Sequence, residues 1–254
     1  VVYEKFTALK VENERKIREH ASGAYGTLTD SARADGKATQ LCAGYKTKID
    51  DGKASTSVVS FSLDDREAPT VSTLRSRPGA VFASADALYL SVRHAKSTSG
   101  DRWYASYDTS DEVSEIHKFQ IGERPRDTAY VGSGVVPGHV LNQFAMDEWY
   151  GYLRVATTRG RVPDPNVSSS VSVLAETEGG SLVRVGAVDK IAPGEDIRAV
   201  RFDDARGYVV TFKKTDPLFV LDLAEPARPK VMGELKIPGF STYMHRIDPD
   251  HLLS

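Results

Sequence analysis

Cysteine is almost missing from this chain of 254 residues, which contains only Cys42. A single thiol forms no internal disulfide and builds no thiolate metal cluster. Cys42 has no charged residue beside it, so we expect a free structural thiol. A chain without disulfides is compatible with the cytosol and also with many bacterial secreted proteins.

Long apolar runs and a strong charge of either sign are missing as well. No run approaches the roughly 20 apolar residues that span a bilayer. The formal net charge is −2, which gives no electrostatic reason to expect nucleic acid as a partner. The first residues, VVYEKFTALK, lack the charged and apolar regions of a signal peptide. Both ends fall within strand-like patterns, so we expect a piece of a longer protein, with any targeting signal or membrane anchor outside this segment.

The motifs of several enzyme classes are also not found. There is no GxSxG nucleophile elbow, no GxxxxGK[ST] phosphate loop and no GxGxxG dinucleotide loop. The histidines show neither the HxH nor the HExxH spacing of a zinc site. They are His20, His94, His117, His139, His245 and His251. We therefore predict no catalytic residues and no metal ligands.

What the sequence does contain is a repeated pattern of short strands, clearest in residues 215–248. The run LFVLDL (218–223) is rich in large apolar residues and reads as a strand. Two X-Pro pairs then break it, and Val231 to Ile237 forms the next strand. Pro238-Gly239 marks a turn before a third strand, Ser241 to Ile247.

The Pro-Gly pair recurs through the chain at intervals of about 45 to 60 residues. It occupies positions 78–79, 137–138, 193–194 and 238–239. Each unit holds four strand-like runs, and no amphipathic helix of useful length interrupts them. A four-stranded sheet cannot cover both of its faces alone, so repeated sheets stack on one another. We therefore predict an all-β fold, a β-propeller of four-stranded antiparallel blades, with a β-sandwich as the alternative.

We expect residues 1–254 to form a single β-propeller domain, with residues 1–57 the least well defined. Val1 to Ala21 supplies two strand-like runs, although its charged residues also suit a short helix. These runs could pair with Phe240 to Ser254 in one composite blade, which would give about five blades. The alternative is a fragment of a larger ring. Between His94 and Ser114 the pattern breaks, and we expect a long polar loop.

Three long runs carry a resemblance to a known family. They are GHVLNQFAMDEWYGYLRVATT (138–158), IAPGEDIRAVRFDDARGYVVTF (191–212) and the block from Thr215 to Leu253. The chain resembles the secreted bacterial and archaeal β-propellers that are distantly related to WD40 repeats. The resemblance implies an extracellular or cell-envelope protein with a ring usually larger than this chain. It implies no established reaction and no catalytic residues.

Three residues are our candidates for ligand binding. His245 lies in the strand after Pro-Gly, which we expect to be the innermost of its blade and to face the channel. Tyr243 lies in the same run, and Asp216 lies in the block on which the resemblance rests. Several aromatic residues could form a platform with Tyr243, although inter-blade core is the more usual role. They are Phe144, Trp149, Tyr150, Tyr152 and Phe240.

Pairs of acidic residues raise the possibility of structural calcium, which needs six to eight oxygen ligands. Asp203-Asp204 and Asp248 to Asp250 supply carboxylates but lack a DxDxDG loop, and hairpin turns favour Asp in any case. We expect a binding module that recognises a protein or glycan partner through its loops or channel mouth. The alternative is a hydrolase or lyase with its site in the central channel.

Overall fold

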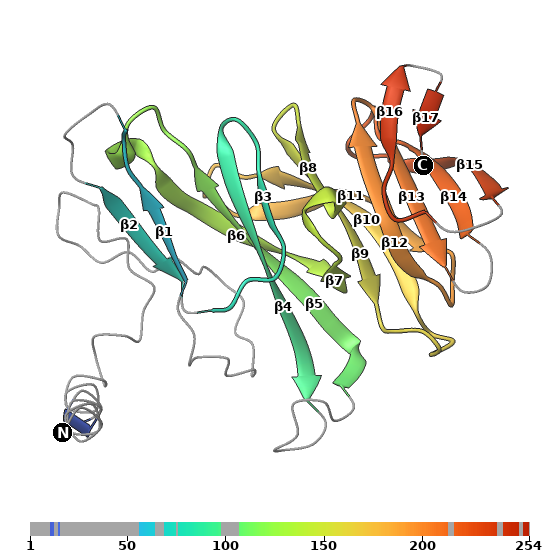
Figure 1. Cartoon of the computed structure of the whole chain (residues 1–254), viewed down its shortest axis with the longest axis horizontal. Helices are drawn as coiled ribbons and strands as arrows, with labels where there is room; N and C mark the ends of the chain where they lie inside the picture. Colours follow the sequence, from blue (N-terminus) through green and yellow to red (C-terminus); the bar gives the residue numbers. More distant parts are fainter. Residues whose placement is uncertain are drawn as a thin grey trace, which may run out of the picture.

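The computed structural model describes most of the chain as a series of antiparallel sheets (Figure 1). It describes residues 11, 12, 15, 56–63, 69–74, 76–97, 107–212, 216–237, 241–248 and 251–253. Within them, no helix is long and apolar enough to cross a membrane.

Three consecutive sheets form the centre of the molecule, and we call them blades 1, 2 and 3. Blade 1 consists of β3 (Val81–Ala83), β4 (Ala87–Ser97), β5 (Tyr107–Gln120) and β6 (Ala129–Pro137). Blade 2 consists of β7 (His139–Val140), β8 (Met146–Trp149), β9 (Tyr152–Arg159), β10 (Ser168–Glu176) and β11 (Leu182–Ile191). Blade 3 consists of β12 (Asp196–Asp203), β13 (Arg206–Phe212), β14 (Asp216–Asp222) and β15 (Lys230–Ile237). In blades 1 and 3 the strands are hydrogen-bonded in the order of the sequence, and in blade 2 both β7 and β8 pair with β9, which is followed by β10 and β11.

Two smaller sheets flank the blades, and two 3₁₀ turns lie between strands. One sheet pairs β1 (Thr56–Ser60) with β2 (Thr70–Leu74), and the other pairs β16 (His245–Asp248) with β17 (His251–Leu253). They lie at opposite ends of the row (Figure 1). The composite blade expected from Val1 to Ala21 and Phe240 to Ser254 falls mostly outside the described residues and stays a prediction. The 3₁₀ turns are η1 (Pro125–Asp127) and η2 (Gln143–Ala145).

The Pro-Gly pairs lie at equivalent places, where the chain leaves one sheet and enters the next. Pro78-Gly79 precedes β3, Pro137-Gly138 joins β6 to β7, and Pro193-Gly194 joins β11 to β12. Gly138 and Gly194 both have a positive φ, 79° and 85°, which favours glycine. Pro238-Gly239 lies outside the described residues. The repeat that the sequence predicts is therefore confirmed, and it marks the links between blades.

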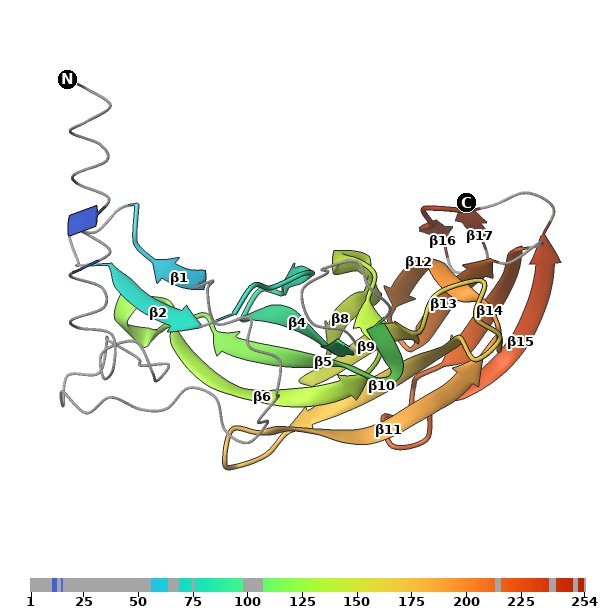
Figure 2. The ribbon, with the colours of Figure 1, turned by 90° about the horizontal axis from the view of Figure 1, so that it is seen from below.

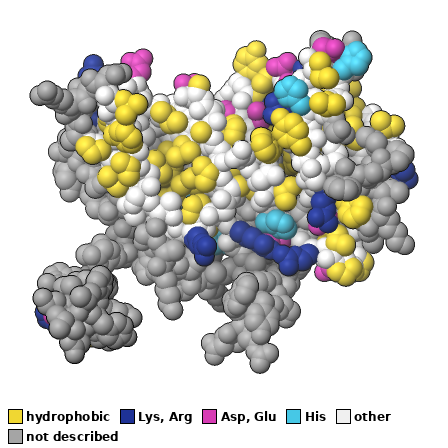
Figure 3. All heavy atoms as spheres, viewed as in Figure 1, with side chains coloured by type: hydrophobic (Ala, Val, Ile, Leu, Met, Phe, Trp, Pro, Cys, Tyr) yellow, Lys and Arg dark blue, Asp and Glu magenta, His cyan; other side chains and the backbone are white. Residues whose placement is uncertain are grey.

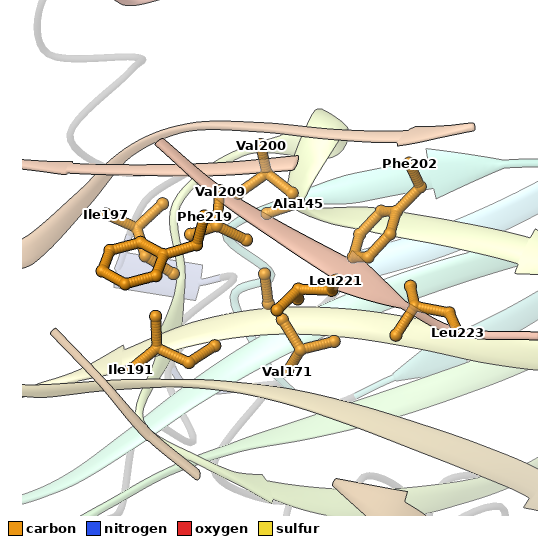
Figure 4. Close-up of a cluster of buried hydrophobic side chains, with 11 residues drawn as sticks. Ala145, Val171, Ile191, Ile197, Val200, Phe202, Val209, Phe219, Leu221 and Leu223 are labelled. Atoms are coloured by element: carbon orange, nitrogen blue, oxygen red, sulfur yellow. The ribbon is translucent and has the colours of Figure 1, made fainter. Parts of the chain in front are cut away.

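The blades stack face to face, and apolar clusters fill the spaces between them. Between blades 2 and 3 the cluster includes Val171, Phe202, Phe219 and Leu221 (Figure 4). A second cluster lies between blades 1 and 2 and includes Tyr89, Ile116 and Leu153, none of which is more than 1% exposed. Full burial of such a side chain stabilises the fold by roughly 1.5–3 kcal/mol. Because a neighbouring blade covers each face of a central sheet, its strands carry apolar residues on both faces. This arrangement is that of β-propeller blades.

The row of blades curves, with the first strand of each blade on its concave side. Figure 2 shows β8 and β12 toward this side, and β6, β11 and β15 along the outer, convex side. The strand order within each sheet agrees with this view. The concave side corresponds to the channel side of a propeller, and it is built from strands that directly follow the Pro-Gly links.

Four predictions about local structure are wrong where the structure describes the residues. Val11, Glu12 and Arg15 are helical, with the Arg15 guanidinium donating to the Glu12 carboxylate, so the helix alternative holds for them. The predicted loop from His94 to Ser114 is mostly strand, because β4 continues to Ser97 and β5 begins at Tyr107.

The other two wrong predictions concern strands that follow a Pro-Gly pair. The strand expected over Val140 to Met146 is divided into β7, η2 and β8. Asn142 and Gln143 interrupt its apolar residues, and the Asn142 side chain caps the 3₁₀ turn. The strand expected from Ser241 begins only at His245.

Candidate functional site

A groove on the concave side is the main candidate for a functional site. Its volume is about 500 Å³, and the first strands of all three blades contribute to it. It is lined by Val81, Phe82, Ala83, Gln143, Phe144, Met146, Asp147, Arg201 and Phe202. Figure 3, viewed from this side, shows hydrophobic side chains gathered among uncharged surface over these strands. Ligand sites often have this combination of an apolar wall and a few polar groups.

The aromatic part of the groove depends on the turn η2. The Asn142 side chain accepts a hydrogen bond of 3.0 Å from the Phe144 backbone N–H and so caps this turn. The turn presents the Phe144 side chain, which is 41% exposed. Tyr243 meets Phe144 edge to face, with ring centroids 5.9 Å apart, and is itself 53% exposed. Two large rings therefore stand in solvent beside the groove.

The carboxylate of Asp147 is already occupied. Arg154 Nε donates to Asp147 Oδ2 at 2.9 Å, and Nη2 donates to the same oxygen. Arg154 Nη1 donates to the backbone carbonyl of Asp204 in blade 3. The guanidinium lies over the rings of Trp149 and Phe202, 5.3 and 5.2 Å from their centroids. Arg154 is 2% exposed, so this ion pair joins blades 2 and 3 in addition to neutralising the acid of the groove.

Arg201 differs from Arg154 because its charge is not compensated. No described residue forms an ion pair or a hydrogen bond with its side chain, and its Nε atom is buried without a partner. A buried N–H without an acceptor is unfavourable. The groove therefore has one uncompensated positive charge, beside the neutral amide of Gln143 and the neutralised Asp147.

A buried carboxylate, Glu112, joins blades 1 and 2 away from the groove. Its side chain is fully buried, forms an ion pair with Arg93 and lies 3.2 Å from Nδ1 of His139. The backbone N–H of Gly160 donates to it at 3.1 Å. Burial tends to raise the pKa of Glu112, but His139, Arg93 and Gly160 together outweigh burial and lower it. Glu112 is therefore ionised near neutral pH and holds the link between these blades.

A second buried group lies on the opposite face of blade 1, around Glu115. Ser133 Oγ donates to Glu115 Oε1 at 2.8 Å, and Nε2 of His94 lies 3.5 Å from Oε2. Burial opposes ionisation of Glu115, but His94, Ser133 and His117 outweigh it and lower its pKa. Burial also lowers the pKa of His117, against the attraction of Glu115. His117 is therefore neutral near neutral pH, and its Nδ1 lies 3.1 Å from the Tyr130 hydroxyl.

Polar contacts recur at the first hairpin of each blade. Ser84 donates to Glu148 at 2.5 Å between blades 1 and 2, and Arg154 reaches Asp204 between blades 2 and 3. Arg246 of β16 binds the Asp203 carboxylate at the far end of blade 3. These contacts fix each blade against the next at one level. They also give Asp203 a cationic partner, which opposes the calcium role considered for it.

The three candidates from the sequence lie in different places. Tyr243 lies beside the groove, in contact with Phe144. His245 is exposed at the start of β16, and Asp216 starts β14, which is two strands away from β12 in its sheet. The groove residues Phe82, Arg201 and Phe202 were missed. The signal for them was in the sequence, because they lie in strands that follow Pro-Gly, as His245 does.

No group of three or more His, Cys, Asp and Glu side chains in the described ranges is arranged to hold a metal ion. Asp250 lies outside those ranges, so calcium at residues 248–250 stays a prediction. The chemical character of the groove is therefore set by its aromatic rings and by Arg201.

Comparison with known proteins agrees with the architecture. The chain is 46% identical over 145 residues to an uncharacterized protein of Archaeoglobus fulgidus, a match that covers 57% of the chain and 22% of that relative. It is 51% identical over 123 residues to an uncharacterized protein of Methanocaldococcus jannaschii, covering 48% of the chain and 19% of the relative. The aligned part thus spans only about a fifth of either relative. The model of the family described as "Beta propeller domain" matches residues 3–254, and the chain belongs to this family.

Proposed function

We propose that this chain is part of a binding module that recognises a protein or glycan partner at the concave groove. The observation that supports the proposal is the exposure of Phe144 and Tyr243 beside a groove of about 500 Å³. Phe144 is presented by a capped turn, so its exposure is built into the local structure. Exposed aromatic rings beside a concave surface are typical of recognition sites.

The rigid support of the groove favours a role in ligand binding. Arg154 and Asp147 fix β8 against β12 immediately beneath it, and the apolar clusters fix the blades against one another. A preorganised surface loses little conformational entropy when a ligand binds. Binding at such a surface therefore needs no new folding of the chain.

A binding screen with matched variants tests this proposal. The purified chain is exposed to a random peptide library and to an oligosaccharide array, and Phe144→Ala and Tyr243→Ala are compared with Phe61→Ala. Phe61 is also exposed, at 62%, but does not line the groove. We expect binders of the wild-type chain to lose affinity about tenfold or more with Phe144→Ala or Tyr243→Ala, and to be unaffected by Phe61→Ala. Binders equally affected by all three variants, or no binders at all, would reject the groove as the recognition site.

We also propose that the protein works outside the cytoplasm or in the cell envelope. This rests on its resemblance to exported propellers. Immunoblotting of cell fractions tests it: the protein is expected in the envelope or the medium, and recovery in the cytoplasmic fraction alone would refute it.

A further inference from the structure

We propose that the groove binds an extended peptide segment in which a carboxylate lies next to a large apolar side chain, with the carboxylate on Arg201. This inference rests on the proposed function and names the chemistry of its ligand. It begins from the charges of the groove. Asp147 is neutralised by Arg154, whereas Arg201 has no described partner, so the groove favours an anion.

The walls of the groove indicate what surrounds that anion. Most of the lining is apolar and includes the rings of Phe82, Phe144 and Phe202. Among the described residues, the polar side chains that line it besides Arg201 are Gln143 and Asp147. A charged sugar would leave many hydroxyl groups without hydrogen-bond partners against such walls, and unpaired polar groups are costly. A peptide with an aromatic or aliphatic side chain beside its acid matches them better.

The backbone of the groove suits an extended chain. Within the part of the molecule that the structure describes, β3 and β12 each pair with one neighbour only, β4 and β13. β8 likewise pairs only with β9. Along their other edges no described strand is paired, although the Ile197 N–H of β12 donates to Thr158 Oγ1. An extended peptide can bind to such an edge by strand addition. The edges then supply affinity, and Arg201 together with the phenylalanines supplies selectivity.

Selection from a library of random dodecapeptides tests the inference. The bait is the whole chain, either wild type or carrying Arg201→Gln, and Arg206→Gln is the matched control. Arg206 lies on the adjacent strand β13, is exposed and does not line the groove. We expect wild type and Arg206→Gln to enrich peptides with Asp or Glu next to an aromatic or aliphatic residue. Arg201→Gln should enrich apolar peptides without the acid.

Affinities of one selected peptide provide the quantitative arm, measured by fluorescence anisotropy with its acid intact or replaced by the corresponding amide. A charge-assisted hydrogen bond is worth about 1.5–3 kcal/mol, so the replacement should weaken binding to wild type roughly tenfold to a hundredfold. It should have little effect on binding to Arg201→Gln. Equal loss in both proteins would show that the acid does not bind Arg201 and would overturn the inference.

The other outcomes separate this inference from the proposed function. Enriched peptides without an acid that still depend on Phe144 would overturn the inference and leave the binding role intact. Oligogalacturonate binding that depends on Arg201, with no peptide enriched, would overturn the inference in favour of an acidic glycan. If neither a peptide nor a glycan is retained, the proposed function fails as well.

Discussion

The buried Arg154 provides the sharpest test of how the blades are joined. Arg154→Ala removes two hydrogen bonds to Asp147 and one to the Asp204 carbonyl, and it removes the cation that lies over Trp149 and Phe202. Breaking a buried ion pair by removing one partner typically costs about 3–5 kcal/mol. Asp147 is 28% exposed at its side chain and regains some hydration, so we expect a loss near the lower end, about 3 kcal/mol.

The assay is urea unfolding followed by far-UV circular dichroism and by the fluorescence of the two tryptophans, Trp103 and Trp149. Arg198→Ala is the control, because Arg198 is 46% exposed in its ion pair with Asp196, and its loss should cost less than about 1 kcal/mol. The double variant Arg154→Met, Asp147→Leu removes both charges and should recover roughly half of the loss. A change for Arg154→Ala no larger than that for Arg198→Ala would refute the idea that this pair holds blades 2 and 3 together.

Two further predictions concern the blade link and the buried titratable groups. Gly138→Ala should destabilise the fold by more than about 2 kcal/mol, because φ is 79° and a Cβ would lie 2.5 Å from the Thr158 carbonyl oxygen. Gly233→Ala, where a Cβ meets nothing within 4 Å, should be neutral or slightly stabilising in the same urea-unfolding experiment; similar effects of both would contradict this. The pKa values of His117 and Glu115 are lowered from their ordinary 6.5 and 4.5, so the folded state binds fewer protons than the unfolded state. Stability should therefore fall as the pH drops below 6.5 and fall further below 4.5. His117→Gln should flatten the first decline in urea midpoints measured from pH 8 to 5, and an unchanged slope would contradict its assignment to His117.

The repeated architecture could be predicted because its signals are local. Pro-Gly strongly favours a turn and occurs at the links between blades. The strands show alternating or continuous apolar residues, a pattern that can be recognised without knowing which strands pair. The positive φ of Gly138 and Gly194 explains why glycine occupies these two links.

The hairpin of β4 and β5 could not be predicted in the same way. Glu112 and Ser114 fall in the predicted loop and Glu115 directly follows it, but all three are buried in β5. Their burial is possible only because partners from other strands neutralise or hydrogen-bond them: His139 and Gly160 belong to the next blade. A pattern of polar residues along one strand does not contain that information.

The candidate site was predicted in part. The sequence indicated Tyr243 and the strand after Pro-Gly, and Tyr243 does lie beside the groove. It did not indicate Arg201, because its significance depends on its lack of a partner, whereas the similar Arg154 is fully engaged. The difference between the unpartnered Arg201 and the engaged Arg154 arises only when the blades pack together.

Hydrogen–deuterium exchange with a bound peptide from the selection tests the central claim most directly, namely that first strands from successive blades form one binding surface. We expect slower exchange on binding in three separate stretches, Val81–Ala83, Gln143–Asp147 and Arg201–Phe202. Protection confined to one of them, or found only on the convex strands β6, β11 and β15, would contradict the account.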